Sequence, residues 1–195
     1  FNALSSNSLL SIKLLSFVTS KLHNIMKTII KNKQAFSDKD NLILLCNKES
    51  DLSAFSISKD ELNYIQKKQK EGKEIITINQ YSRLVFVVNP KSENKANKHL
   101  EDVRLLGDKL QVNLKDEDSV MIIDVKGNQT EVLAITEGIA LANYTFTSRK
   151  TDPKPNTLRT LYLCKNASEN DTKELQNLVD AVYLTRDLIN EPFSH

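Results

Sequence analysis

The sequence feature that most constrains the fold is an uninterrupted apolar run, Leu84-Val-Phe-Val-Val88. A strand with one face in water alternates apolar and polar residues, whereas a strand that is apolar at every position must be buried on both faces. We therefore expect a sheet covered by helices on both sides. Further apolar runs predict strands at Leu42–Cys46, Ser119–Val125 and Leu158–Cys164.

Helical patterns separate these strands. Ser58-Lys-Asp-Glu61 has the spacing of a capping box, in which the serine and glutamate side chains each bond a free backbone amide. The helix that begins there runs to about Glu71, and Gly72 stands where a left-handed C-cap is expected. A second helix, from about residue 94 to 114, carries a core-facing stripe on which Gly107 would let it approach the sheet closely. This stripe consists of Ala96, Leu100, Val103, Gly107, Leu110 and Leu114.

Two more helices are expected in the second half of the chain. Residues 128–144 predict a helix with the small residues Ala134, Gly138, Ala140 and Ala142. Residues 147–158 are polar, contain two prolines and lack periodicity, so they predict a loop. Asp171-Thr-Lys-Glu174 predicts the start of a final helix, which Pro192 would end or kink. The expected core face of that helix contains Leu175, Leu178, Val182 and Ile189.

The resulting order is β-α-β-β-α-β-α-β-α. The strands predicted at Glu74–Ile78 and Arg83–Val88 are too close for a crossover helix, so we expect an antiparallel hairpin there. Elsewhere the alternation of strands and helices is typical of parallel pairing. The predicted fold class is α/β, a three-layer structure with a mixed, largely parallel sheet and helices on both faces.

Charge and hydropathy exclude two classes of partner. The net charge is only +2, and lysines alternate with acidic residues instead of forming the basic patch typical of a nucleic-acid-binding protein. No apolar run approaches the ~20 residues that span a bilayer, so we expect no membrane partner.

The first 25 residues are rich in leucine and serine and differ from the rest of the chain. They contain no initiating methionine and no basic start, and Lys13 interrupts the apolar stretch, which is not the pattern of a secretory signal. Met26 opens a segment that resembles an ordinary start. We therefore expect residues 1–25 to be a non-native or disordered extension outside the fold.

The chain lacks the glycine-rich loops that bind phosphate groups. Its four glycines are scattered, so neither a dinucleotide fingerprint nor a P-loop is present. Gly127 follows a predicted strand, but a single glycine there is more typical of a plain turn. The sequence also contains no His-Glu-x-x-His stretch and no Gly-x-Ser-x-Gly elbow.

The residues that could form a metal site or a nucleophile are dispersed. The acidic pair Asp38/Asp40 and the run Asp116-Glu-Asp118 fall in polar connections, where solvated turns are expected. The cysteines end apolar strands, which favours buried free thiols in a reducing compartment. His99 adjoins the core-facing stripe of a helix, so it is expected to be a boundary or core histidine rather than a ligand. We therefore predict no catalytic, cofactor-binding or metal-binding residue. This prediction includes the two cysteines, Cys46 and Cys164, and the other two histidines, His23 and His195.

Two stretches resemble the leucyl aminopeptidase family of metallopeptidases. Glu137-Gly138-Ile-Ala-Leu141-Ala-Asn-Tyr144-Thr-Phe146 is similar to the family pattern of Glu-Gly, a Leu three residues later and then Tyr-x-Phe. In the family this segment precedes a lysine-rich loop, for which the chain has Arg149, Lys150 and Lys154. Thr185-Arg186-Asp187-Leu188-Ile189-Asn190-Glu191-Pro192 resembles the family's Arg-Asp-Leu-x-Asn-x-Pro segment, which leads into the catalytic domain.

The resemblance covers about residues 26–195 and implies a macro-domain-like fold. Residues 26–185 would be the N-terminal domain of such an enzyme, and residues 186–195 would start the connection to a missing catalytic domain. The family is cytosolic and hexameric and uses two divalent metal ions, zinc or manganese, to remove N-terminal residues from peptides. Its metal ligands and catalytic residues lie beyond the Asn-x-Pro segment, so none is carried over to this chain.

Three functions therefore remain open. The chain is a non-catalytic domain that supports assembly and access to a catalytic domain, a stand-alone module of macro-domain type that binds a nucleotide such as ADP-ribose, or an α/β interaction domain without a ligand. The first hypothesis predicts an exposed apolar patch near the final helix, where the other domain would dock. The second requires backbone amides in glycine-rich loops, which the sequence lacks. Arg186 and Asp187 are expected either to bridge to the catalytic domain or to lie exposed.

Overall fold

A computed structural model describes residues 27–91, 95–147, 156–164 and 167–191. The extension expected at residues 1–25, the basic loop residues Arg149, Lys150 and Lys154, and Pro192 lie outside these ranges. The elements in chain order are β1 (Ile29–Lys33), β2 (Leu42–Leu45), the short 3-10 helix η1 (Ser53–Phe55), α2 (Lys59–Lys70), β3 (Ile75–Asn79), β4 (Leu84–Val88), α3 (Ala96–Leu114), β5 (Ser119–Asp124), α4 (Gln129–Ala142), β6 (Thr160–Cys164) and α5 (Glu169–Asn190).

The strands form one sheet in the order β1-β6-β5-β2-β4-β3. β2 lies near its centre and pairs in parallel with both β4 and β5. β6 pairs in parallel with β5 and with β1. Only the β3–β4 pair of this sheet is antiparallel, which confirms the predicted hairpin. The largely parallel, mixed sheet is therefore as the sequence predicts.

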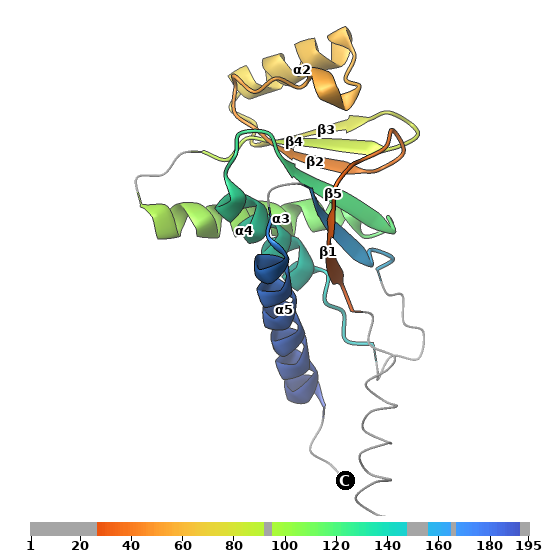
Figure 1. Cartoon of the computed structure of the whole chain (residues 1–195), viewed down its shortest axis with the longest axis vertical. Coiled ribbons are helices and arrows are strands. Elements are labelled where there is room, and N and C mark those ends of the chain that lie inside the picture. The colour runs from red at the N-terminus through yellow and green to blue at the C-terminus, as the bar shows by residue number, and fades with distance from the viewer. Residues whose placement is uncertain (1–26, 92–94, 148–155, 165–166, 192–195) are drawn as a thin grey trace, which may run out of the picture.

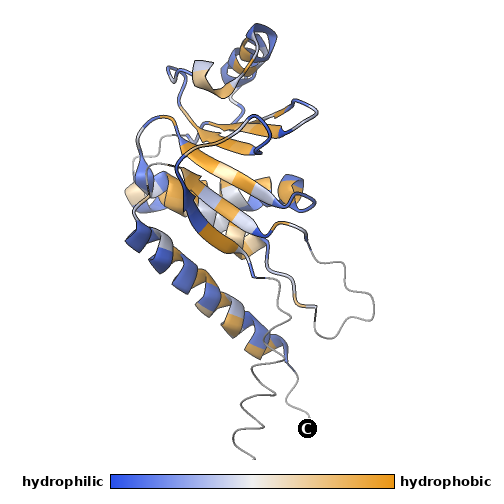
Figure 2. Ribbon diagram, turned by 45° about the vertical axis from the view of Figure 1, so that its right-hand side comes forward, coloured by the Kyte–Doolittle hydropathy of each residue, from blue (hydrophilic) through white to orange (hydrophobic). Residues whose placement is uncertain are grey.

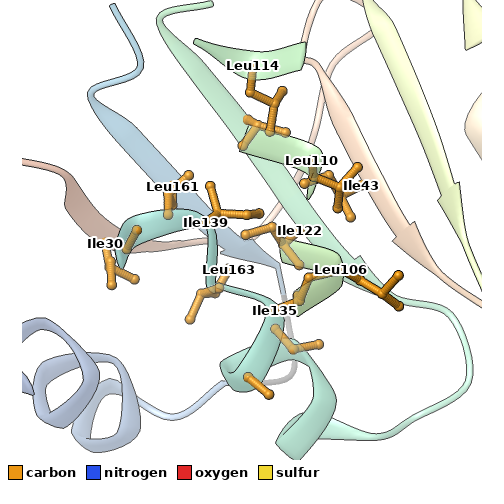
Figure 3. Packing of buried hydrophobic residues seen from close by; sticks show 14 of the residues in the cluster. Ile30, Ile43, Leu106, Leu110, Leu114, Ile122, Ile135, Ile139, Leu161 and Leu163 are labelled. Atoms are coloured by element: carbon orange, nitrogen blue, oxygen red, sulfur yellow. The ribbon is translucent and has the colours of Figure 1, made fainter. Parts of the chain in front are cut away.

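Helices cover both faces of the sheet, in three layers (Figure 1). On one face, α3, α4 and α5 contribute Leu110, Ile135 and Val179 to a core that also includes Ile122 of β5. Figure 3 shows these α3 and α4 residues meeting the strands. On the other face, η1 and α2 cover a smaller cluster that includes Ile65. The central strands are accordingly the most apolar part of the fold (Figure 2), and the predicted fold class is confirmed.

The predicted ends of α2 are confirmed in detail. The hydroxyl of Ser58 accepts a hydrogen bond from the amide of Glu61, whose carboxylate accepts one from the amide of Ser58. At the other end Gly72 has φ +76°. Its amide donates to the carbonyl of Gln69, and the amide of Lys73 donates to that of Lys68. These two bonds satisfy the last carbonyls of the helix, as in a Schellman motif.

β1 is a strand that the sequence analysis did not predict. Its segment, Ile-Ile-Lys-Asn-Lys, offers only two apolar residues, and its pairing with β6 joins residues 131 positions apart. A side chain covers its outer edge: the amide of Ile30 donates to Oε1 of Gln176 at 2.7 Å, and Nε2 of Gln176 donates to the carbonyl of Thr28 at 3.2 Å. α5 thus satisfies edge groups that would otherwise invite pairing with another chain.

Two predictions about α5 were wrong. The helix begins at Glu169, with Ser168 as its N-cap, because the hydroxyl of Ser168 accepts the amide hydrogen of Asp171. Its buried face also differs from the expected one, since Leu178 and Ile189 are 44% and 75% exposed. Leucines occur on two sides of this helix, so spacing alone did not identify the buried side, which consists of Thr172, Leu175, Val179 and Tyr183.

Gly107 also has a different neighbour from the one expected. A methyl group on Gly107 would meet the backbone of α4, 2.9 Å from the amide nitrogen of Ile139 and closer still to the carbonyl oxygen of Ile135. A methyl on Gly138 would meet the backbone of Arg104 in the same way. Gly107 therefore permits close packing of α3 on α4 rather than on the sheet.

Among the described residues, no helix is long and apolar enough to cross a membrane.

Candidate functional site

Within the described residues, polar side chains gather at one edge of the sheet and at the ends of α4 and α5. The first is the edge where β2, β4 and β5 end, which is where α/β sheets usually bind ligands. Loops after these strands and the end of α2 border an open cavity of about 750 Å³. Its charged lining is mostly basic: Lys48, Lys73, Lys91 and Lys126, with Glu49 and Glu74. Lys91 pairs with Glu74 at 3.5 Å.

A buried carboxylate lies behind this cavity, in the first turn of α4. Glu131 is only 3% exposed, and its Oε2 lies 2.7 Å from Nζ of Lys126. Its Oε1 accepts a hydrogen bond from Nδ2 of Asn128 and lies 3.0 Å from Nε2 of His99. The other ring nitrogen of His99 lies 3.0 Å from the carbonyl oxygen of Lys91. His99 therefore joins the loop after β4 to α4, and its side chain is 18% exposed, which agrees with the boundary or core position expected from the sequence.

The turn before α4 is a plain one, as predicted. Gly127 has φ +84°, and its amide and that of Lys126 both donate to Oδ1 of Asp124. The side chain of Asp124 thus occupies backbone amides of the kind that could otherwise hold a phosphate group. The first turn of α4 also already contains the carboxylate of Glu131.

The cysteines are both buried and free, as expected from the sequence. Burial raises the pKa of the Cys46 thiol to about 11, although the positive charge of Lys126 acts in the opposite direction. The thiol of Cys46 is therefore protonated at neutral pH and is not a nucleophile. Cys164 is 2% exposed at the end of β6.

The carboxylates that the sequence singled out are in loops, where solvated turns were expected. Asp40 forms an ion pair of 2.9 Å with Lys33 and accepts hydrogen bonds from Ser37. Burial would raise its pKa, but the hydrogen bonds from Lys33 and Ser37 outweigh this and lower it. Asp38 lies 3.9 Å from the buried guanidinium of Arg83. Of the second acidic group, Glu117 accepts a hydrogen bond from Asn41.

These side chains do not converge. Among the described residues, no group of three or more His, Cys, Asp or Glu could hold a metal ion. This part of the chain therefore does not fit the two-metal centre that the family resemblance implies for a whole enzyme. His23 and His195 lie outside the described ranges.

The second polar cluster joins the ends of α4 and α5, and we call it the α4–α5 latch. Tyr144, just after α4, donates its hydroxyl hydrogen to Oδ1 of Asp187 at 2.8 Å. Nη1 of Arg186 donates to the carbonyl of Leu141 at 2.6 Å, and its guanidinium lies over the ring of Tyr144. Nδ2 of Asn190 is 3.4 Å from the Tyr144 hydroxyl. The latch therefore consists of Leu141, Tyr144, Arg186, Asp187 and Asn190.

The latch changes the expectation for Arg186 and Asp187. Both were expected either to reach another domain or to lie exposed, but both are half-buried and bind the end of α4. α5 continues without a break through the expected domain boundary at residues 185 and 186.

A buried network that the sequence analysis missed supports the latch from inside. The Tyr183 hydroxyl donates to the carbonyl of Ala140 and lies 3.0 Å from Oγ1 of Thr28. Nδ2 of Asn143 donates to Thr28 and to the carbonyl of Leu158. Burial raises the pKa of Tyr183 to about 12. A polar residue at the end of an apolar helix, as Asn143 is, was the only sequence signal for this network.

Comparison with known proteins gives similarity at the level of fold. No family model matches the sequence, and no curated protein matches it. Among solved structures, a tomato leucine aminopeptidase variant aligns with 87% of the chain at 13% identity and a TM-score of 0.62. A Caenorhabditis elegans leucine aminopeptidase aligns with 85% of it at 15% identity and a TM-score of 0.53. An Oceanobacillus iheyensis macrodomain variant aligns with 80% of it at 13% identity and a TM-score of 0.47.

The two aminopeptidases are much longer than the part that aligns. The chain covers 39% of the tomato protein and 36% of the nematode protein. It therefore spans well under half the length of either enzyme, and the similarity shows a shared fold for that part.

Proposed function

We propose that this chain is the non-catalytic N-terminal domain of a leucyl aminopeptidase-type metallo-exopeptidase, and that it acts in assembly and in access to a catalytic domain. The fold is similar to part of two leucine aminopeptidases over more than four fifths of the chain. The two sequence segments that resemble the family lie in the C-terminal half of α4 with the residues after it, and in α5.

One observation carries the proposal beyond the fold. The two segments are separated by residues 147–184, which include β6 and most of α5, yet their polar residues meet in the α4–α5 latch. Tyr144 belongs to the first segment, and Arg186, Asp187 and Asn190 belong to the second. Because these residues match the family pattern and also bind one another, we infer that together they fix the direction in which α5 leaves the domain.

The chemistry of the proposed enzyme belongs to its other domain. Two divalent ions, zinc or manganese, would be held there and would activate water for peptide hydrolysis. The described residues of this chain supply no metal ligands, so their role is to fold, to hold α5 and to meet neighbouring domains or subunits. In this proposal the whole enzyme is a homo-hexamer that acts on peptides in the cytoplasm.

The alternative is a stand-alone nucleotide-binding module. The basic cavity beside β2 and β4 favours it, because lysines attract phosphate groups. The buried carboxylate of Glu131 counts against it, since a phosphate at the start of α4 would approach that negative charge. Micromolar binding of ADP-ribose, measured by calorimetry, would favour the alternative.

The direct test is the reading frame beyond His195, determined from the transcript. The proposal requires that it continue into a domain with clustered metal ligands of the histidine and carboxylate type. A frame that ends without such a domain would refute the proposal.

A further inference from the structure

The side chain of His99, on α3, contacts two other parts of the fold. Its Nδ1 lies 3.0 Å from the carbonyl oxygen of Lys91, in the loop after β4. Its Nε2 lies 3.0 Å from Oε1 of Glu131, in the first turn of α4. The His99 side chain is 18% exposed and that of Glu131 only 5%, so both contacts are largely shielded from water. We call His99, Glu131, Lys126 and the carbonyl of Lys91 the His99 clasp.

The other partners of Glu131 determine which atoms donate. Nζ of Lys126 lies 2.7 Å from Oε2, and Nδ2 of Asn128 donates to Oε1. Ammonium and amide nitrogens only donate hydrogen bonds, so both oxygens of Glu131 act as acceptors. A carboxylate is also a much weaker base than an imidazole, so a proton between Glu131 and His99 resides on the ring. Nε2 of His99 therefore carries a hydrogen.

The other side of the ring gives the same result for Nδ1. A backbone carbonyl oxygen only accepts, so Nδ1 must carry a hydrogen to bond Lys91. A neutral imidazole has one N–H and could satisfy only one of the two oxygens. The doubly protonated, positively charged ring donates to both. The His99 clasp therefore places two cations, His99 and Lys126, on the two oxygens of one buried carboxylate.

The charged groups around His99 come from several segments. α4 contributes the carboxylate of Glu131, and the turn before it contributes the ammonium of Lys126. The ammonium of Lys91 is paired with Glu74 at 3.5 Å, so it is directed to the segment before β3. The negative charge in contact with the ring is that of Glu131. On the first turns of α3 itself, the charged residues near His99 in sequence are Lys95, Lys98, Glu101 and Asp102.

We propose that His99 is a pH-sensitive switch, which binds the loop after β4 to α4 only while its ring is doubly protonated. Histidine is the side chain that ordinarily changes charge between pH 5 and 8. The bond to the charged carboxylate is the stronger of the two, so the proton that leaves for solvent is that on Nδ1. The lone pair of Nδ1 then faces the carbonyl oxygen of Lys91, and because both are acceptors the bond is lost.

The switch acts on the basic cavity at the same edge of the sheet. Lys91 and Lys126 both line that cavity, and the His99 clasp links the two segments that carry them. Loss of the Nδ1 proton frees the backbone of Lys91, while Lys126 stays paired with Glu131. The inference goes beyond the proposed function, because it concerns this chain alone and does not depend on a catalytic domain.

The test is a titration of the 195-residue chain by nuclear magnetic resonance, between about pH 5 and pH 9. Long-range nitrogen spectra report the hydrogen on each ring nitrogen, and the assigned backbone signals identify His99. We expect both nitrogens of His99 to carry hydrogen at the acid end, and Nδ1 alone to lose it as the pH rises. The carbonyl carbon signal of Lys91 should shift with the same midpoint.

Two variants separate the switch from general effects of pH. His99→Gln should abolish the pH-dependent shift of the Lys91 carbonyl carbon. His23→Gln, which removes a histidine that is not one of the clasp residues, is the matched control and should leave that shift intact. A His99 ring with a single hydrogen at every pH, loss of the hydrogen from Nε2 instead of Nδ1, or a Lys91 signal that does not follow the ring would overturn the inference. The titration of the original protein gives each of these results by itself, so the test does not depend on the folding of His99→Gln.

Discussion

The close contact between α3 and α4 gives a sharp prediction for Gly138→Ala. The new methyl group would meet the backbone carbonyl of Arg104, and its third-nearest neighbour, the Cα of Arg104, would be 3.1 Å away. These are backbone atoms, so no side-chain rotation can relieve the contact. The two helices would have to move apart, and both contribute to the main core.

The net effect is the difference between two terms. Alanine in place of a helical glycine stabilises a helix by about 1 kcal/mol. Overpacking of a rigid contact costs about 1–3 kcal/mol or more, and the backbone contact places Gly138→Ala at or beyond the upper end. We expect a net loss of about 2 kcal/mol in the free energy of unfolding for Gly138→Ala, which corresponds to a fall in Tm of about 4–8 °C.

Urea unfolding followed by circular dichroism measures this loss. Gly107→Ala should also destabilise the protein, because its methyl group would lie 2.9 Å from the amide nitrogen of Ile139. The double variant should lose less than the sum of the two single variants, since one displacement of α3 from α4 makes room for both methyl groups. A Gly138→Ala protein as stable as the original, or more stable, would refute the close contact.

Three other substitutions test the buried polar groups. Tyr183→Phe should cost about 1 kcal/mol at neutral pH through its lost hydrogen bonds. The pKa of Tyr183 is raised to about 12 from 10.0. Ionisation of Tyr183 therefore leaves the free energy of unfolding of the original protein unchanged below pH 10, and lowers it by about 2–3 kcal/mol as the pH rises to 12. Urea unfolding of Tyr183→Phe between pH 9 and 12 should lack this fall, and parallel curves for the two proteins would contradict it. Arg83→Met should cost about 3 kcal/mol, because the buried guanidinium donates to the carbonyl of Phe55 and to Gln80. A change in the urea midpoint equivalent to less than 1 kcal/mol would show that these bonds are dispensable. Glu131→Gln should cost about 2–4 kcal/mol, because it leaves the ammonium of Lys126 without its buried partner. Thermal unfolding checks this, and an unchanged Tm would be inconsistent with the ion pair.

The sheet and most helices could be predicted from local sequence because burial leaves a local pattern. The run Leu84–Val88 is apolar because both faces of β4 are covered. The Ser58 capping box and Gly72 mark the ends of α2 through bonds between residues only a few positions apart. Such features depend on neighbours in the chain, so they are visible without a structure.

The features that were missed depend on distant partners. β1 is a strand because β6 and Gln176 pair with it, and the sequence Ile-Ile-Lys-Asn-Lys alone is a weak signal. The face of α5 was misassigned because its leucines lie on more than one side, and Leu178 and Ile189 belong to the exposed ones. Tyr183 and Asn143 meet Thr28 across more than a hundred residues, which no local pattern records.

Hydrolysis of leucine p-nitroanilide tests the central claim most directly, measured side by side for the 195-residue chain and the product of the complete reading frame, with and without manganese or zinc. A non-catalytic domain predicts metal-dependent release of p-nitroaniline by the longer protein and none by the 195-residue chain. Metal-dependent hydrolysis by the 195-residue chain, or none by the longer protein, would contradict it.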